Sequence, residues 1–138
     1  MNHRIGGRKF GLPSDQRRAL LKGLVRALFV YQTIQTTETR AKDVRSIAEK
    51  LITGARVDTI HARRLARKYL SDETLVHHLF TQIAPEFRDI NGGFTRMVKI
   101  GARRGDAAPI VQLALITDRQ FGMPTAPEKT GQPGHARK

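Results

Sequence analysis

Residues 94–116 of the chain read FTRMVKIGARRGDAAPIVQLALI. Between Phe94 and Ile100 the side chains of the even-numbered residues alternate with those of Thr95, Met97 and Lys99, and such a period of two is typical of a β-strand. Residues 110–116 form a second and more apolar run, which predicts a largely buried strand. A basic link that contains glycine, residues 101–109, joins the two runs. The stretch therefore predicts an antiparallel β-hairpin.

Four segments before this hairpin have apolar residues at helical spacing, and each begins at a residue that can cap a helix. The helices are expected to begin at Ser14, at Thr37 or Thr39, at Asp58 or Thr59, and at Ser71 or Asp72. The fourth is expected to end at Pro85, because proline has no backbone N–H to donate. The predicted buried face of the third helix is Ala62, Leu65, Ala66, Tyr69 and Leu70. The Thr-rich segment 32–37 predicts a short strand.

This order of elements predicts an α+β fold in two layers, with about four helices packed on a small three-stranded mixed sheet. A single globular domain is expected over residues 14–117. Residues 1–13 carry glycines and basic residues without an acid, and they predict an extended basic arm. Residues 118–138 are polar and interrupted by prolines and glycines, so we expect a flexible tail.

The net charge is the most unusual property of the composition. The chain has 25 Lys and Arg against 12 Asp and Glu, a formal charge of +13. The charge is also sorted along the chain, since residues 1–26 hold seven basic residues and one acid. Residues 69–95 hold one basic residue and four acids, which are expected to face solvent or a protein neighbour. Such sorting is typical of a protein that lays part of its surface on a phosphate backbone.

Several classes of function are disfavoured by what the sequence contains. Without cysteine the chain cannot form disulfides, thiolate metal sites or cysteine nucleophiles. No apolar run approaches the ~20 residues that cross a bilayer, so no membrane partner is expected. His77 and His78 are adjacent and would point apart on a helix, which makes a poor metal pair. No metal, cofactor, small-molecule substrate or catalytic residue is predicted.

Two other functions are alternatives to the binding of a folded RNA through its backbone and shape. The second and third helices could form a helix-turn-helix of a free DNA-binding protein, with Arg63 and Arg64 reading bases. The basic arm and the distant hairpin speak against this alternative, because one groove-reading helix would not need them. The second alternative is an enzyme, and only a turnover assay could support it, because no site in the sequence suggests a substrate. Few aromatic residues are present, so stacking of bases, for example on Phe94, is not the expected mode.

Several motifs resemble those of the ribosomal protein seventeen family of the bacterial-type large subunit. The most specific is IQTTETRAK at residues 34–42, which fits the family pattern Ile-x-Thr-Thr followed by a basic residue, alanine and lysine. Further matches are His3-Arg4, Gly7-Arg8-Lys9, residues 49–53, Arg56, residues 61–64, 92–96 and 103–109. The resemblance extends over about residues 1–117.

The resemblance implies a structural component of the large ribosomal subunit, without catalysis or cofactor. Its implied partners are the ribosomal RNA of that subunit and neighbouring ribosomal proteins. The expected location is the ribosome of a bacterial cytoplasm, with the mature form of an organellar protein as the alternative. We expect the RNA contacts to be made by His3, Arg4, Arg8, Lys9, Arg17, Arg18, Lys22, Arg26, Arg40, Lys42, Arg45, Arg63, Arg64, Arg96, Lys99, Arg103 and Arg104.

Overall fold

The computed structural model of the chain describes residues 7–117, 119, 121–122 and 124. Its elements follow the predicted order of helix, strand, helices and hairpin. They are α1 (Ser14–Tyr31), β1 (Thr33–Thr37), α2 (Glu38–Ala55), α3 (Ile60–Leu70), α4 (Glu73–His78), the π-helical turn η1 (Leu79–Ile83), α5 (Ala84–Glu86), β2 (Thr95–Ala102) and β3 (Pro109–Leu115). The predicted α+β class is confirmed.

The three strands form one sheet in the order β1-β3-β2, and both pairs are antiparallel. The expectation of a mixed sheet is therefore wrong. The helices between β1 and β2 do return the chain so that β2 runs in the same direction as β1, but β3 lies between the two strands and pairs antiparallel with both, so no parallel pair forms. Ile34 is paired with Leu113, and Met97 is paired with the same residue from the other side. The predicted hairpin is thus the centre and one edge of the sheet.

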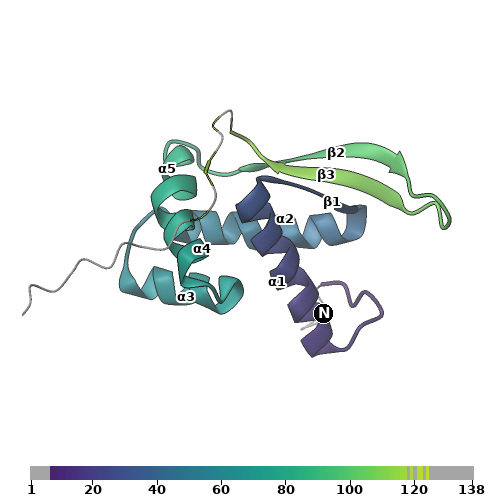
Figure 1. The fold of residues 1–138 in the computed structure, drawn as a ribbon, viewed down its shortest axis with the longest axis horizontal. Helices are drawn as coiled ribbons and strands as arrows, with labels where there is room; N and C mark the ends of the chain where they lie inside the picture. Colours follow the sequence, from purple (N-terminus) through teal and green to yellow (C-terminus); the bar gives the residue numbers. More distant parts are fainter. Residues whose placement is uncertain (1–6, 118, 120, 123, 125–138) are drawn as a thin grey trace, which may run out of the picture.

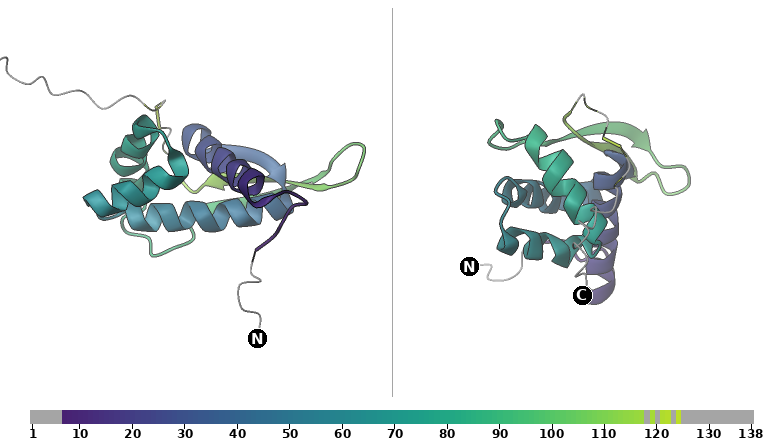
Figure 2. Two further views of the ribbon diagram at one scale, coloured as in Figure 1. Left: turned by 90° about the horizontal axis from the view of Figure 1, so that it is seen from below. Right: turned by 60° about the vertical axis from the view of Figure 1, so that its left-hand side comes forward.

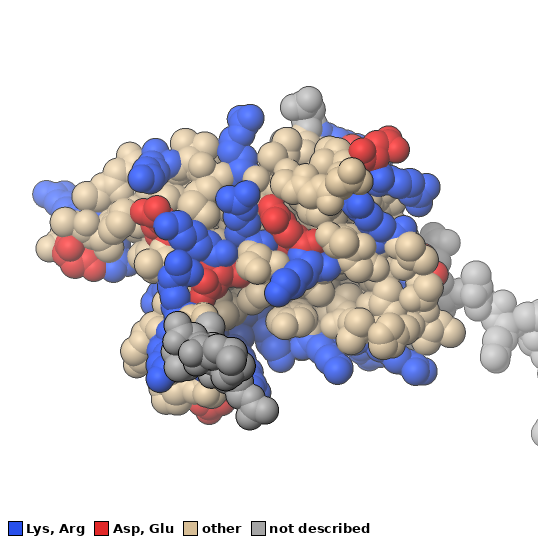
Figure 3. Space-filling view, turned by 180° about the vertical axis from the view of Figure 1, so that it is seen from behind, with Lys and Arg blue, Asp and Glu red and all other residues tan. Residues whose placement is uncertain are grey.

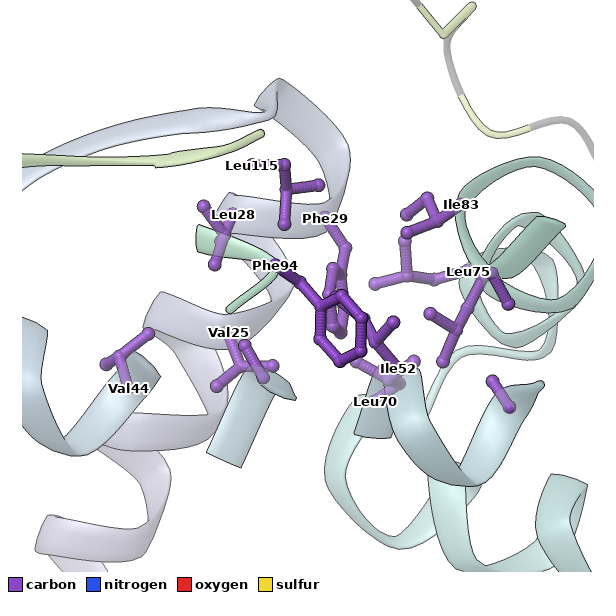
Figure 4. Packing of buried hydrophobic residues seen from close by; sticks show 14 of the residues in the cluster. Val25, Leu28, Phe29, Val44, Ile52, Leu70, Leu75, Ile83, Phe94 and Leu115 are labelled. Carbon is purple, nitrogen blue, oxygen red and sulfur yellow. The ribbon is translucent and has the colours of Figure 1, made fainter. Parts of the chain in front are cut away.

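The helices cover one face of the sheet, with the strands above and the helices below in Figure 1. The hairpin β2–β3 extends past the helices at the right of that view. At the other end the start of the hairpin enters the core, where Phe94 is 1% exposed and its ring centre lies 5.2 Å from that of Phe87. Figure 4 shows Phe94 among Phe29, Ile52 and Leu70 from three helices. The core therefore anchors one end of the hairpin and leaves the other end projecting.

The third helix buries a narrower face than the spacing predicts. Ala66 and Leu70 are buried, but Leu65 is 45% and Tyr69 is 40% exposed. The prediction that these two side chains belong to the buried face is wrong. At the edge of the bundle, α3 packs on α1, α2 and α4 along one stripe, and the flanks of that stripe stay in contact with solvent.

The fourth predicted helix continues past Pro85, contrary to expectation. A π-helical turn, Leu79–Ile83, interrupts it, and α5 begins again at Ala84. Pro85 follows directly after this π-helical turn, as one of the first residues of α5, a position in a helix where proline is tolerated.

Both predicted end segments contact the domain where they are described. In residues 7–13 Arg8 forms an ion pair with Asp43 of α2, and the N–H of Leu12 donates to the carbonyl of Lys9 at 3.1 Å, so this part of the arm makes a turn beside α2. Arg119 pairs with Glu86 at 2.8 Å, and the ring of Phe121 lies edge-on to His78 at 6.0 Å. Residues 1–6, 118, 120, 123 and 125–138, on which the rest of both expectations falls, lie outside the described residues.

Candidate nucleic-acid interface

The expected RNA contacts fall into two groups once their partners are known. Five of them form ion pairs within the chain, namely Arg8 with Asp43, Lys42 with Glu38, Arg45 with Glu49, Arg63 with Asp58 and Arg103 with Asp106. Ten others form no ion pair with any described residue: Lys9, Arg17, Arg18, Lys22, Arg26, Arg40, Arg64, Arg96, Lys99 and Arg104. His3 and Arg4 lie outside the described residues. A cation without a carboxylate partner can neutralise a phosphate without giving up an existing contact.

Arg103 and Asp106 close the loop at the tip of the hairpin. The guanidinium Nε of Arg103 donates to the Asp106 carboxylate at 3.0 Å, and the N–H of Ala108 donates to the same carboxylate at 3.2 Å. The hydrogen bond from Arg103 has the largest effect on the pKa of Asp106, and together with the bond from Ala108 it holds this pKa well below its usual range. The backbone of Arg103 adds two bonds, to Ala107 and Ala108. Arg103 thus holds the loop closed, whereas its neighbour Arg104 is exposed and pairs with no carboxylate among the described residues.

Arg63 and Arg64 show the same division on α3. Arg63 donates two hydrogen bonds to Asp58, at 2.6 and 2.8 Å, and its guanidinium carbon lies 4.9 Å from the ring centre of Phe80. The hydrogen bond raises the pKa of Arg63 and lowers that of Asp58. Arg64 is exposed. Because Arg63 is held at the start of α3, the helix-turn-helix alternative loses one of its two base-reading side chains.

The basic residues of α2 are interspersed with acids. Lys42 lies 3.2 Å from Glu38 and Arg45 lies 3.4 Å from Glu49, each pair one helical turn apart. Figure 3 shows this mixture of blue and red across the middle of the back face, over α2. Along the lower edge of the same view, over α3, the blue side chains have few red neighbours. The free positive charge therefore gathers on α3 more than on α2.

Arg40 comes together with a distant part of the chain. It lines a pocket of about 250 Å³ with Phe10 from the arm and Arg103 from the hairpin loop. The arm, the start of α2 and the base of the hairpin loop thus meet at one end of the molecule. The hairpin and α3 lie at opposite ends of the long axis in Figure 1, so the expected contacts form several surfaces rather than one.

Comparison with known proteins identifies the family. The model of the family described as ribosomal protein L17 matches residues 20–116. The large ribosomal subunit protein bL17 of Thermoanaerobacter sp. (strain X514) is 53% identical over 112 residues, which cover 81% of this chain and all of that protein. The protein of the same name from Clostridium beijerinckii is 52% identical over 111 residues, 80% of this chain and 98% of the relative. The chain belongs to the ribosomal protein L17 family.

The L17 family match spans α1 from its second turn to the end of β3, and it includes the expected contacts from Lys22 to Arg104. This confirms the resemblance that the motifs indicated. In the described ranges no group of three or more His, Asp or Glu side chains is placed to hold a metal ion. No helix of the described part has the length and apolarity needed to cross a membrane.

Three residues with the properties of an interface were not among the expected contacts. Arg56 has two guanidinium nitrogens, Nε and one Nη, that are buried without a described hydrogen-bond partner, and its guanidinium carbon lies 4.9 Å from the ring centre of Phe94. Lys68 and Tyr69 line a pocket with residues of α1 and α2. Arg56 is one of the residues that match the family motifs, so the sequence did contain a signal that it is functional. For Tyr69 the sequence contained no such signal, because its position in the helical pattern is that of a buried core residue.

Proposed function

We propose that this chain, as a member of the L17 family, is a structural constituent of the large ribosomal subunit that binds ribosomal RNA through its unpaired basic residues. The family assigns it a part in translation as a component of the ribosome and not as an enzyme. The observation that carries the RNA contact is the sorting of the cations, ten of which have no carboxylate partner in the described chain.

Three surfaces supply these contacts in the proposal. The projecting hairpin offers Arg96, Lys99 and Arg104, which are all exposed. The arm and the start of α1 supply a second surface, and the exposed flank of α3 supplies a third. Separate basic surfaces on one small domain suit a folded RNA whose helices approach the protein from several sides, since each phosphate row needs its own cations.

The arm is proposed to enter a crevice of the RNA, with Arg4, Arg8 and Lys9 near phosphates. Gly7 and Gly11 have φ values of +95° and +66°, and nothing lies within 4 Å of the Cβ that either could carry. Their role is thus conformational, because both positions require a positive φ, and Gly11 lies in the turn from Lys9 to Leu12. Arg8 would exchange its partner Asp43 for a phosphate or hold the arm against α2 beside it.

The test is incorporation into large subunits. A chain without residues 1–11 is expected to keep its globular domain, since α1 begins at Ser14, and to enter large subunits less well than the full chain. Co-sedimentation with large subunits in competition with chromosomal DNA separates this function from free DNA binding. If about six phosphates are contacted, the logarithm of affinity for ribosomal RNA should fall with log salt with a slope of roughly −5. Equal incorporation of both chains would refute the role of the arm, and a flat salt dependence would refute the RNA contact.

A further inference from the structure

A pocket that the expected contacts do not explain lies where α1, α2 and α3 meet. It has a volume of about 300 Å³ and is lined by Arg18, Leu21, Lys22, Ile47, Lys68 and Tyr69. The three helices pack on one another, and Figure 2 (left) shows them side by side from below. Two of the lining residues were expected to contact RNA, and Tyr69 was expected in the core.

The lining combines an apolar floor with a cationic rim. Leu21 and Ile47 are half-buried, and Tyr69 keeps 40% of its surface exposed beside them. Arg18, Lys22 and Lys68 form no ion pair with any residue in the described part of the chain, and no carboxylate lines the pocket. Three cations around one hollow repel each other, so their arrangement favours an anion at the rim.

These features together match the chemistry of a nucleotide. A base is flat and apolar on its faces, and it stacks on a tyrosine ring whichever base it is. Its phosphate is the anion that lysine and arginine bind. The volume is at the lower end for a small-ligand site, so it has room for one base and not for a duplex.

We propose that this pocket takes a single unstacked nucleotide of the ribosomal RNA, with its base against Tyr69 and its phosphate at Arg18, Lys22 and Lys68. The proposal rests on the proposed RNA-binding function and deepens it. The proposed contact is a stacked base. The amino-acid composition had indicated that the RNA is recognised only through its backbone and shape. Single-stranded loops and bulges are the parts of an RNA that can supply such a base.

The experiment compares the full-length chain with four variants in binding to purified large-subunit ribosomal RNA over a series of salt concentrations. Tyr69→Leu removes the ring and keeps a good helix former, and Tyr69→Phe keeps the ring. Tyr31→Leu is the matched control, because Tyr31 is 68% exposed at the end of α1, away from the pocket lining. Lys68→Gln removes one rim charge. Thermal unfolding of each variant confirms that it is folded.

The expected loss for Tyr69→Leu is about 5- to 150-fold in affinity, the range measured for stacked bases in other proteins, with the salt slope unchanged. Tyr69→Phe and Tyr31→Leu should bind as the unaltered chain does. Lys68→Gln should reduce the size of the salt slope by about one, since one phosphate contact is lost. An ultraviolet crosslink from Tyr69 to a nucleotide outside a duplex would agree with these results.

The proposal is overturned if Tyr69→Leu binds the RNA as the unaltered chain does. It is equally overturned if Tyr69→Leu loses capture of an acidic peptide of a neighbouring protein and keeps its RNA affinity, because the pocket would then belong to a protein contact. In both cases a steep salt dependence of the unaltered chain would leave the proposed function standing. A flat salt dependence would overturn both.

Discussion

The backbone N–H of Phe121 donates a 3.1 Å hydrogen bond to the side-chain carbonyl of Gln32, and the side-chain amide of Gln32 donates to the carbonyl of Arg119 at 2.9 Å. Gln32 ends α1 in the left-handed region with a φ of 65°, and 89 positions separate it from Phe121. One residue thus ends the first helix and holds the segment that follows the last strand.

Glycine substitutions at two helix ends test this double role. Ser71 ends α3 with a φ of 53° and its side chain has no hydrogen bond in the described structure. Ser71→Gly should stabilise the chain by about 0.5 to 1 kcal/mol, because glycine adopts this conformation without strain. Gln32→Gly gains the same relief but loses two hydrogen bonds of about 1 kcal/mol each. Urea unfolding should therefore show it to be less stable than Ser71→Gly, and equal stabilisation would contradict a role for Gln32 beyond the cap.

Arg104 and Arg103 should behave differently on substitution although they are adjacent. Arg104→Gln is expected to reduce the size of the salt slope for ribosomal RNA by about one, with the fold unchanged. Arg103→Gln takes the partner from Asp106, so the hairpin loop should be cut faster by protease in the free protein, with a smaller change in the salt slope. Binding at several salt concentrations and limited proteolysis measure the two effects. An equal loss of slope in both variants would show that Arg103 also contacts phosphate.

The stability of the chain should depend on pH through His78. This side chain is 4% exposed. Its burial lowers its pKa from the usual 6.5, and the charge of His77 lowers this pKa further. The unfolded chain therefore binds the proton more tightly, so stability is complete above pH 6.5 and falls as pH drops toward the lowered pKa. Urea midpoints at about pH 7.5 and about pH 5 should differ, with the lower midpoint in acid.

A pair of histidine variants assigns that dependence. His78→Gln should reduce the difference between the two midpoints, whatever its effect on stability at neutral pH. His61→Gln should keep the difference, because His61 is exposed. If both variants retain the full acid-induced loss, the titrating group is not His78.

Matched valine substitutions test where the core lies. Ile52 is fully buried among helices, and Ile60 is 72% exposed at the start of α3. Ile52→Val should cost about 0.5 to 1.5 kcal/mol, since it removes a methylene from a packed core. Ile60→Val should change stability by less than about 0.5 kcal/mol. Both changes occur in a helix, so the difference between their urea midpoints measures packing rather than helix propensity.

The spacing of residues along the chain was enough to predict the order of helices and strands and the antiparallel hairpin. Periodicity works there because each face is set by a few neighbouring residues, as Ala41, Val44 and Ala48 are on α2. The family motifs at residues 34–42 indicated the L17 family for the same reason, since they are short and continuous.

Other features depended on contacts between segments far apart in the chain. The strand β3 lies between β1 and β2 and makes the sheet antiparallel, and the packing of α3 at the edge of the bundle exposes Tyr69. Adjacent arginines also differ in role. Arg63 and Arg103 have carboxylate partners, whereas Arg64 and Arg104 have none in the described chain. Spacing shows which face of an element a side chain is on. Whether a cation is free for RNA depends on which acid folding brings within reach of it.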